Sequence, residues 1–109
     1  MSTRPRRFQL RRTKGWKKPD GGVSVARPTR WGNPHEADPD RRRDHEQAAE
    51  LVALFRAGVF SADRTGKWKR YPPIEEIPRL LRGHDLGCWC PLDMPCHADV
   101  LLEVANHDD

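Results

Sequence analysis

The stretch LGCWCPLDMPCHADVLLEV, Leu86–Val104, decides the fold of this chain and holds all three of its cysteines. Its opening residues, LGCWC, are typical of a buried strand over Leu86–Cys90. Residues two apart on a strand face the same way, so Cys88 and Cys90 are expected to point to one side. The turn Pro91–Pro95 follows this strand.

The second half of the stretch predicts a helix that begins within two residues of Pro95. Its apolar residues recur at helical spacing, and Cys96 and His97 stand in its first turn. A strand followed by a turn and a helix is a building unit of α/β domains. The expected inner positions of the helix are His97, Val100, Leu101 and Val104.

Three interpretations of this cysteine cluster stay open, and the first is a zinc site. Cys88, Cys90, Cys96 and His97 would form a Cys3His set, whose ligand types and number suit zinc. The spacing C-x-C-x5-C-H differs from the usual pair of C-x2-C hooks. Adjacent helical residues also point about 100° apart, so binding one ion through both Cys96 and His97 requires an irregular turn.

The second interpretation makes Cys96 a catalytic or anion-binding thiol, with His97 as its proton-transfer partner. A helix N-terminus favours the thiolate, so we expect the pKa of Cys96 to be lowered. In the third interpretation the cysteines are small buried hydrophobic side chains, and His97 bonds a carbonyl of the facing loop. The sequence alone does not decide whether the chain is an enzyme.

A second loop, RPTRWGNP (Arg27–Pro34), carries candidate ligand-binding residues and follows the β-rich run GGVSVAR. Guanidinium groups suit phosphate, an indole can stack on a base, and an amide can bond a base edge. The alternative is a rigid turn set by the prolines and the glycine. The candidate binding residues are Arg27, Arg30, Trp31 and Asn33.

The middle of the chain predicts two helices. The longer one is expected to start at Asp44, with Gln47 completing a capping box, and to end at Gly58. The shorter one is expected in PIEEIPRLLRG, which ends at Gly83, and Pro78 can divide it. The expected inner face of the longer helix is Ala48, Leu51, Val52 and Phe55.

Together with a strand pattern at Phe8 and Leu10, these elements predict one small α/β domain. We expect a central, mostly parallel or mixed sheet flanked by about three helices. Ligands of such sheets bind beyond the carboxyl ends of the strands. The two signature loops, Arg27–Pro34 and Cys90–His97, each follow a predicted strand. They are therefore expected to form one pocket that brings Arg27, Arg30 and Asn33 near Cys96 and His97.

Basic residues gather at the start of the chain. Residues 1–31 hold ten Arg/Lys and one acidic residue, whereas residues 32–109 hold ten Arg/Lys and fifteen acidic residues. We therefore divide the chain into a basic N-terminal arm, residues 1–18, and a small α/β domain, residues 19–109. Such an arm can neutralise phosphates, so nucleic acid or a nucleotide is the expected partner, and a solvated tail is the alternative. Replacing Arg6, Arg7, Arg11 and Arg12 with alanine is expected to weaken polyanion binding and to leave folding intact.

Composition limits the class of protein. Hydrophobic residues make up 36% of the chain, and no apolar run has the length of a membrane span, so no membrane is expected as partner. The odd cysteine count and the absence of an apolar leader favour a reducing cytoplasm. The oligomeric state and the identity of the ligand do not follow from the sequence.

Three motifs, RRTKGW, VARPTRWGNP and LGCWCPLDMPCHADVLLEVAN, resemble the family called domain of unknown function 4326, over about Gln9 to Asn106. Members of that family typically carry Gly where this chain has Ala26, and often Phe where it has His35. The family occurs in bacteria and their phages, so the resemblance implies a short α/β domain in a bacterial or host cytoplasm. It implies no activity.

Two functions of different class therefore stand. The first is binding of a nucleotide or of nucleic-acid phosphate in the pocket between the two loops. The second is an accessory protein-interaction module with a structural Cys3His zinc site and no catalytic activity, which binds a host or phage protein through its basic arm.

Overall fold

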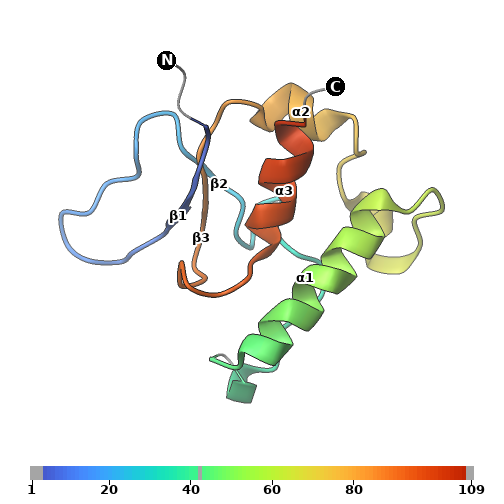
Figure 1. The fold of residues 1–109 in the computed structure, drawn as a ribbon, viewed down its shortest axis with the longest axis horizontal. Helices are drawn as coiled ribbons and strands as arrows, with labels where there is room; N and C mark the ends of the chain where they lie inside the picture. The colour runs from blue at the N-terminus through green and yellow to red at the C-terminus, as the bar shows by residue number, and fades with distance from the viewer. Residues whose placement is uncertain (1–3, 42, 108–109) are drawn as a thin grey trace.

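The computed structural model describes residues 4–41 and 43–107, and within them the chain forms a parallel sheet and three α-helices (Figure 1). The predicted small α/β domain is thereby confirmed. Residues 1–3 of the predicted arm lie outside the described residues, as do Arg42 and residues 108–109 of the predicted domain.

The sheet has the strand order β1-β3-β2 and all its described strands are parallel. Its strands are β1 (Arg7–Gln9), β2 (Val23–Ser24) and β3 (Leu86–Cys88). The predicted interior strand is therefore confirmed as β3, although it ends at Cys88 and the chain bends over residues 89–90. β1 comes from within the predicted arm, so this part of the basic segment belongs to the sheet.

Close packing against Phe8 explains the glycine at the centre of β3. A Cβ atom on Gly87 would lie 2.3 Å from Cε2 of Phe8, so the ring occupies the space that a side chain would need. A glycine inside a strand usually destabilises it, and it is often found where another group approaches the backbone this closely. Phe8 thus covers the middle of the sheet, and the strand pattern predicted around it is present.

The described residues form three α-helices, α1 (His45–Phe60), α2 (Glu76–Leu81) and α3 (His97–Ala105), and α3 packs on the sheet while α1 and α2 pack on α3. The central one is α3, which contacts β1 and β3 as well as α1 and α2 (Figure 1). Its predicted inner face is largely correct, although Val104 is only half-buried. The most deeply buried large side chains are Val25, Phe55, Val59, Ile77, Leu81, Leu86, Val100 and Leu101.

The ends of α1 differ in part from the prediction. Asp44 is the N-cap, and its carboxylate accepts the backbone N–H groups of Glu46 and Gln47. Gln47 does not close a capping box, because its buried amide bonds the backbone of Asp38 and Arg41 instead. Of the predicted inner positions, Phe55 is buried, whereas Ala48, Leu51 and Val52 are half-buried.

The prediction that α1 ends at Gly58 is wrong, since the helix continues to Phe60. The reason for glycine is packing: a Cβ atom there would lie 2.0 Å from Cε2 of Trp68. The missing side chain lets the indole, which lies in the 3-10 helix Gly66–Arg70, pack directly on the helix backbone.

Pro78 does not divide α2. It stands in the first turn of that helix, where a missing N–H removes no intrahelical hydrogen bond. Gly83 follows the helix with a φ of +81°, the left-handed conformation that favours glycine after a helix. The short second helix is therefore present and ends where it was expected to end.

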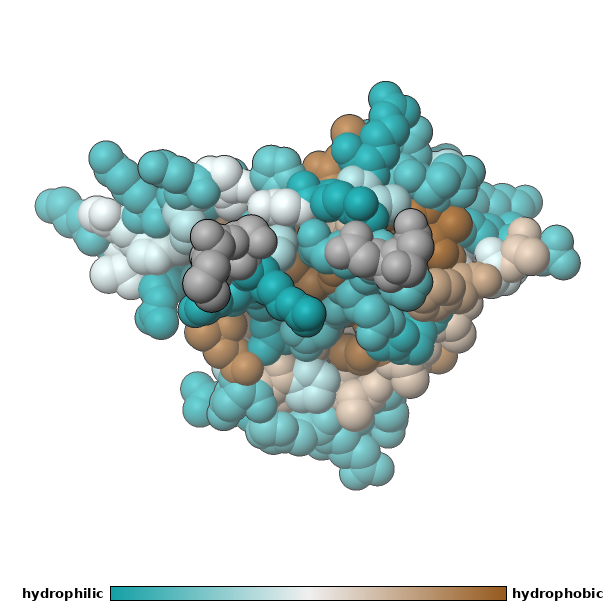
Figure 2. All heavy atoms as spheres, turned by 45° about the horizontal axis from the view of Figure 1, so that its top comes forward, coloured by the Kyte–Doolittle hydropathy of each residue, from teal (hydrophilic) through white to brown (hydrophobic). Residues whose placement is uncertain are grey.

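The surface is largely hydrophilic on the face shown in Figure 2, with apolar patches between polar side chains. None of the helices in the described parts of the chain combines the length and the apolar character that crossing a membrane requires.

Candidate metal centre

The end of β3 brings the first two thiols together. Cys88 is the last residue of the strand and Cys90 lies two residues further on, in the bend after it, and the two side chains come together as predicted. Their Sγ atoms are 3.7 Å apart. All three cysteines of the chain are free thiols.

The start of α3 adds the third sulfur and the imidazole. Cys96 is the N-cap of this helix, with the extended dihedrals φ −148° and ψ 149°. This non-helical backbone turns its side chain toward its neighbour, and Cys96 Sγ lies 3.6 Å from His97 Nδ1. The irregular turn that a shared ion requires is therefore present.

A capping box fixes the N-cap. The sulfur of Cys96 accepts the backbone N–H of Asp99, and the carboxylate of Asp99 accepts the backbone N–H of Cys96. The two bonds hold Cys96 in its extended conformation at the mouth of the helix. Asp99 is thus a capping residue of this site.

The backbone of Val25, the residue directly after β2, orients His97. His97 Nε2 lies 2.8 Å from the carbonyl oxygen of Val25. A carbonyl can only accept a hydrogen bond, so Nε2 donates to it, and Nδ1 is the ring nitrogen that faces the sulfur of Cys96. Histidine ligands of metals are oriented in this way, by a carbonyl bond through the other ring nitrogen.

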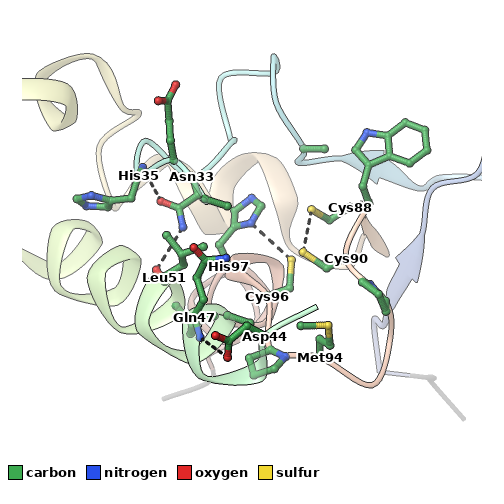
Figure 3. Close-up of a pocket in the computed structure, with 18 of the residues that line it drawn as sticks. Asn33, His35, Asp44, Gln47, Leu51, Cys88, Cys90, Met94, Cys96 and His97 are labelled. Atoms are coloured by element: carbon green, nitrogen blue, oxygen red, sulfur yellow. Dashed lines mark hydrogen bonds between the residues drawn. The ribbon is translucent and has the colours of Figure 1, made fainter. Parts of the chain in front are cut away.

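The four side chains form one cluster, and Figure 3 shows the three sulfurs turned toward one another with His97 beside Cys96. The ligand atoms of Cys88, Cys96 and His97 all lie within 4.8 Å of one another, and these three residues are buried. Cys90 joins them through Cys88 and is half-buried. The arrangement can hold a metal ion, and it unites all four residues that the sequence singled out.

We expected a lowered pKa at Cys96, but within the cluster the thiol with the lowered pKa is Cys88. Hydrogen bonds from Cys90 and then Cys96 lower the pKa of Cys88. The same contact with Cys88 raises the pKa of Cys90 to about 11, and contacts with Cys88 and Cys90 raise the pKa of Cys96. The expected lowering at Cys96 is therefore wrong, because the sulfurs of Cys88 and Cys90 raise its pKa. The catalytic role of Cys96 and His97 stays a prediction.

Arg7 braces the loop between the two pairs of ligands. Its guanidinium donates to the carbonyls of Pro91, Leu92 and Met94 and forms a 3.0 Å ion pair with Asp99. Its side chain is only 8% exposed, and its bond to Met94 is partly buried, whereas the bonds to Pro91, Leu92 and Asp99 lie at exposed groups. Arg7 thus departs from the expectation that its replacement leaves folding intact, because its bonds fix the loop before Cys96.

The two signature loops meet, as predicted, at a cavity of about 740 Å³. Arg27 and Asn33 line it together with the four cluster residues, and Figure 3 shows Asn33 beside His97. Residues of α1, among them Gln47 and Leu51, form a further wall. A cavity of this size is in the range of small-molecule sites.

The polar groups of the predicted binding loop are largely engaged within the protein. Arg27 donates to the carbonyls of Asn33 and Pro34 and pairs with Glu36. The amide of Asn33 donates to the carbonyl of Leu51 and accepts the N–H of His35. These bonds make the loop a rigid turn that is fixed to α1.

The other two candidates of this loop do not line the cavity. Trp31 is 5% exposed, and its ring meets Tyr71 edge-on, while the Tyr71 hydroxyl donates to the Trp31 carbonyl. Arg30 is exposed and stacks over the Trp31 ring, 5.1 Å from its centroid. Trp31 is thus part of the hydrophobic core in this structure.

Three groups near the site carry no sequence signal of their own. They are the brace Arg7, the Val25 carbonyl that orients His97, and Trp89, a residue of the cavity wall whose indole is exposed. An arginine among seven other basic residues of the arm, and a backbone oxygen, cannot be distinguished by pattern. For Trp89, the CWC triplet is the one available hint, since an aromatic side chain between two same-facing residues must face the other way.

Comparison with known proteins supports the resemblance seen in the motifs. The model of the family described as a domain of unknown function (DUF4326) matches residues 8–107. No curated protein and no solved structure matches the chain. Because the match covers nearly the whole chain, the protein belongs to the DUF4326 family.

Proposed function

We propose that this protein is a zinc-binding module in which Cys88, Cys90, Cys96 and His97 hold one zinc ion. The geometry of the donor atoms carries the proposal. Zinc binds sulfur at about 2.3 Å and nitrogen at about 2.0–2.1 Å, so tetrahedral ligands lie about 3.8 Å apart for two sulfurs and about 3.6 Å for sulfur and nitrogen. In the structure the Sγ atoms of Cys88 and Cys90 are 3.7 Å apart, and Cys96 Sγ lies 3.6 Å from His97 Nδ1.

The surroundings of the donors support the same reading. The carbonyl of Val25 orients the imidazole, and the capping box together with Arg7 fixes the loop that separates the two ligand pairs. Such outer bonds hold metal ligands ready and raise affinity. An ion at this point would tie the end of β3 to the start of α3, which favours a structural role.

Cobalt titration tests the proposal, because Co²⁺ replaces zinc and thiolate ligands give it strong visible absorption. The reduced full-length protein is expected to bind one Co²⁺ with a tetrahedral spectrum, which zinc then removes. Cys96→Ser and His97→Ala should shift the spectrum and weaken binding. His45→Ala, which changes an exposed histidine at the start of α1, is the matched control and should bind like the wild type. A featureless spectrum contradicts the proposal.

A second candidate function is binding of a nucleotide in the cavity, which the meeting of the two loops around about 740 Å³ favours. Arg43 lines this cavity and forms no ion pair within the described residues, so it is the group we propose for a phosphate. ATP titrated in a calorimeter should bind, and Arg43→Ala should weaken it while the exposed control Arg70→Ala does not. An absence of binding heat at two temperatures contradicts this candidate.

The zinc proposal also bears on compartment and partner. Thiolate ligands must be reduced to bind a metal, so we propose the cytoplasm as the place of action. Nucleic acid is the partner that we propose for the basic segment near the site.

A further inference from the structure

Trp89 is a large aromatic side chain held at the surface between two ligands of the proposed zinc site. It is 42% exposed, while its neighbours Cys88 and Cys90 turn inward. The guanidinium of Arg12 lies over its ring, 4.8 Å from the centroid. Gln9 donates to the Trp89 carbonyl, so the end of β1 also supports its backbone. A rigidly mounted, half-exposed indole is a surface to which a flat partner can bind.

The segment between β1 and β2 surrounds this indole with positive charge. Five of the eight residues 11–18 are Arg or Lys and none is acidic. All five are exposed, and none forms an ion pair within residues 4–41 and 43–107. Figure 1 shows the segment extending from the body as a long loop, and Figure 2 shows the same projection in hydrophilic colours. The five residues are Arg11, Arg12, Lys14, Lys17 and Lys18.

We infer that Trp89 and this basic loop bind single-stranded nucleic acid, with an unpaired base on the indole and the backbone phosphates along the loop. An aromatic platform beside a cationic track is the arrangement that binds single strands without sequence preference. Duplex DNA offers only its phosphates to such a surface, because its bases are already stacked. Arg12 joins the two parts, since it touches the indole and belongs to the loop.

The position of Trp89 couples this surface to the metal centre. The peptide of Trp89 connects Cys88 to Cys90, so an ion held by both sulfurs would fix the backbone that carries the indole. A fixed platform loses less conformational freedom on binding than a mobile one. Zinc loading should therefore strengthen nucleic-acid binding, and this coupling alone rests on the proposed function.

Fluorescence anisotropy with labelled oligothymidylate, oligouridylate and a DNA duplex tests the inference on the zinc-loaded full chain. Trp89→Ala should weaken binding of the single strands by about 5- to 100-fold, the contribution of one stacked base, and Trp89→Phe should retain most of it. Phe60→Ala removes an exposed aromatic on α1 and is the matched control. Equal effects on the two oligomers indicate recognition of any single strand, and a larger effect on one identifies DNA or RNA as the source.

Charge is tested in the same assay. Replacing Lys14, Lys17 and Lys18 with alanine should weaken binding and reduce its salt dependence, while replacing Lys67 and Lys69 should not. Unchanged affinity in Trp89→Ala, or equal losses for duplex and single strands, overturns the inference even if zinc binds. If the protein holds no zinc, the proposed function fails, and the Trp89 variants of the metal-free chain still decide the stacking role.

Discussion

Replacing Arg7 with alanine should destabilise the protein far more than its place in a basic segment suggests. The guanidinium makes hydrogen bonds of 3.2, 2.9 and 2.7 Å to the carbonyls of Pro91, Leu92 and Met94. A hydrogen bond to a charged group contributes about 1.5–3 kcal/mol, and water can replace the partner at exposed carbonyls. The bond to Met94 is partly buried, so its loss costs most.

The ion pair with Asp99 adds little, about 0–1 kcal/mol, because that carboxylate is half exposed. The sum predicts a loss of about 1.5–4 kcal/mol in the free energy of unfolding. Urea denaturation at a fixed zinc concentration measures it, since a bound ligand shifts apparent stability. Arg6→Ala is the matched control, because the Arg6 side chain is exposed and only its backbone pairs with the sheet. Equal stability of the two variants would refute the bracing role of Arg7.

Two further predictions concern α1 and its N-terminus. Gly58→Ala should lower the free energy of unfolding by about 1–3 kcal/mol, because the new Cβ would overlap the Trp68 ring. This loss should exceed the gain from the higher helix propensity of alanine. Thermal denaturation measures the change, and a more stable variant would contradict the packing of Trp68 on Gly58. At Asp44, the hydrogen bond from Arg41 lowers the carboxyl pKa, so its stabilising contribution is complete above the ordinary pKa and is lost as the pH falls through the lowered one. Asp44→Asn should remove this part of the acid dependence, and identical acid denaturation profiles for variant and wild type would show that the cap contributes nothing.

The strand–turn–helix unit could be predicted from sequence because its signals are local. Alternation over Leu86–Cys90 and helical spacing after Pro95 are properties of neighbouring residues, and both elements are present. The expected proximity of Cys88 and Cys90 is also present, although Cys90 lies in the bend after the strand and not in the strand itself.

The geometry at Cys96 could not be predicted in this way. The argument that Cys96 and His97 diverge assumes that both are helical, whereas Cys96 is an extended N-cap. Asp, Asn, Ser and Thr are the usual N-cap residues, so a cysteine gives no comparable signal. The difference of one residue in the helix start decides whether the two side chains can share an ion.

Long-range packing decides the roles of Trp31 and Arg7, which the sequence motifs left open. The Trp31 side chain belongs to the core because Tyr71, forty residues away, donates to its carbonyl and packs on its ring. Arg7 resembles every other arginine of the basic segment until the fold places it against the turn before Cys96. Such contacts depend on tertiary structure, which periodicity and composition do not encode.

The metal content of the native protein tests the central claim most directly. Native mass spectrometry of the reduced full-length chain, reconstituted with zinc and freed of excess, should show one zinc ion per chain. The ion should be lost in Cys96→Ser and His97→Ala and retained in His45→Ala. A wild-type chain that retains no zinc, or a His97→Ala variant that retains it fully, would contradict the assignment of Cys88, Cys90, Cys96 and His97 as its ligands.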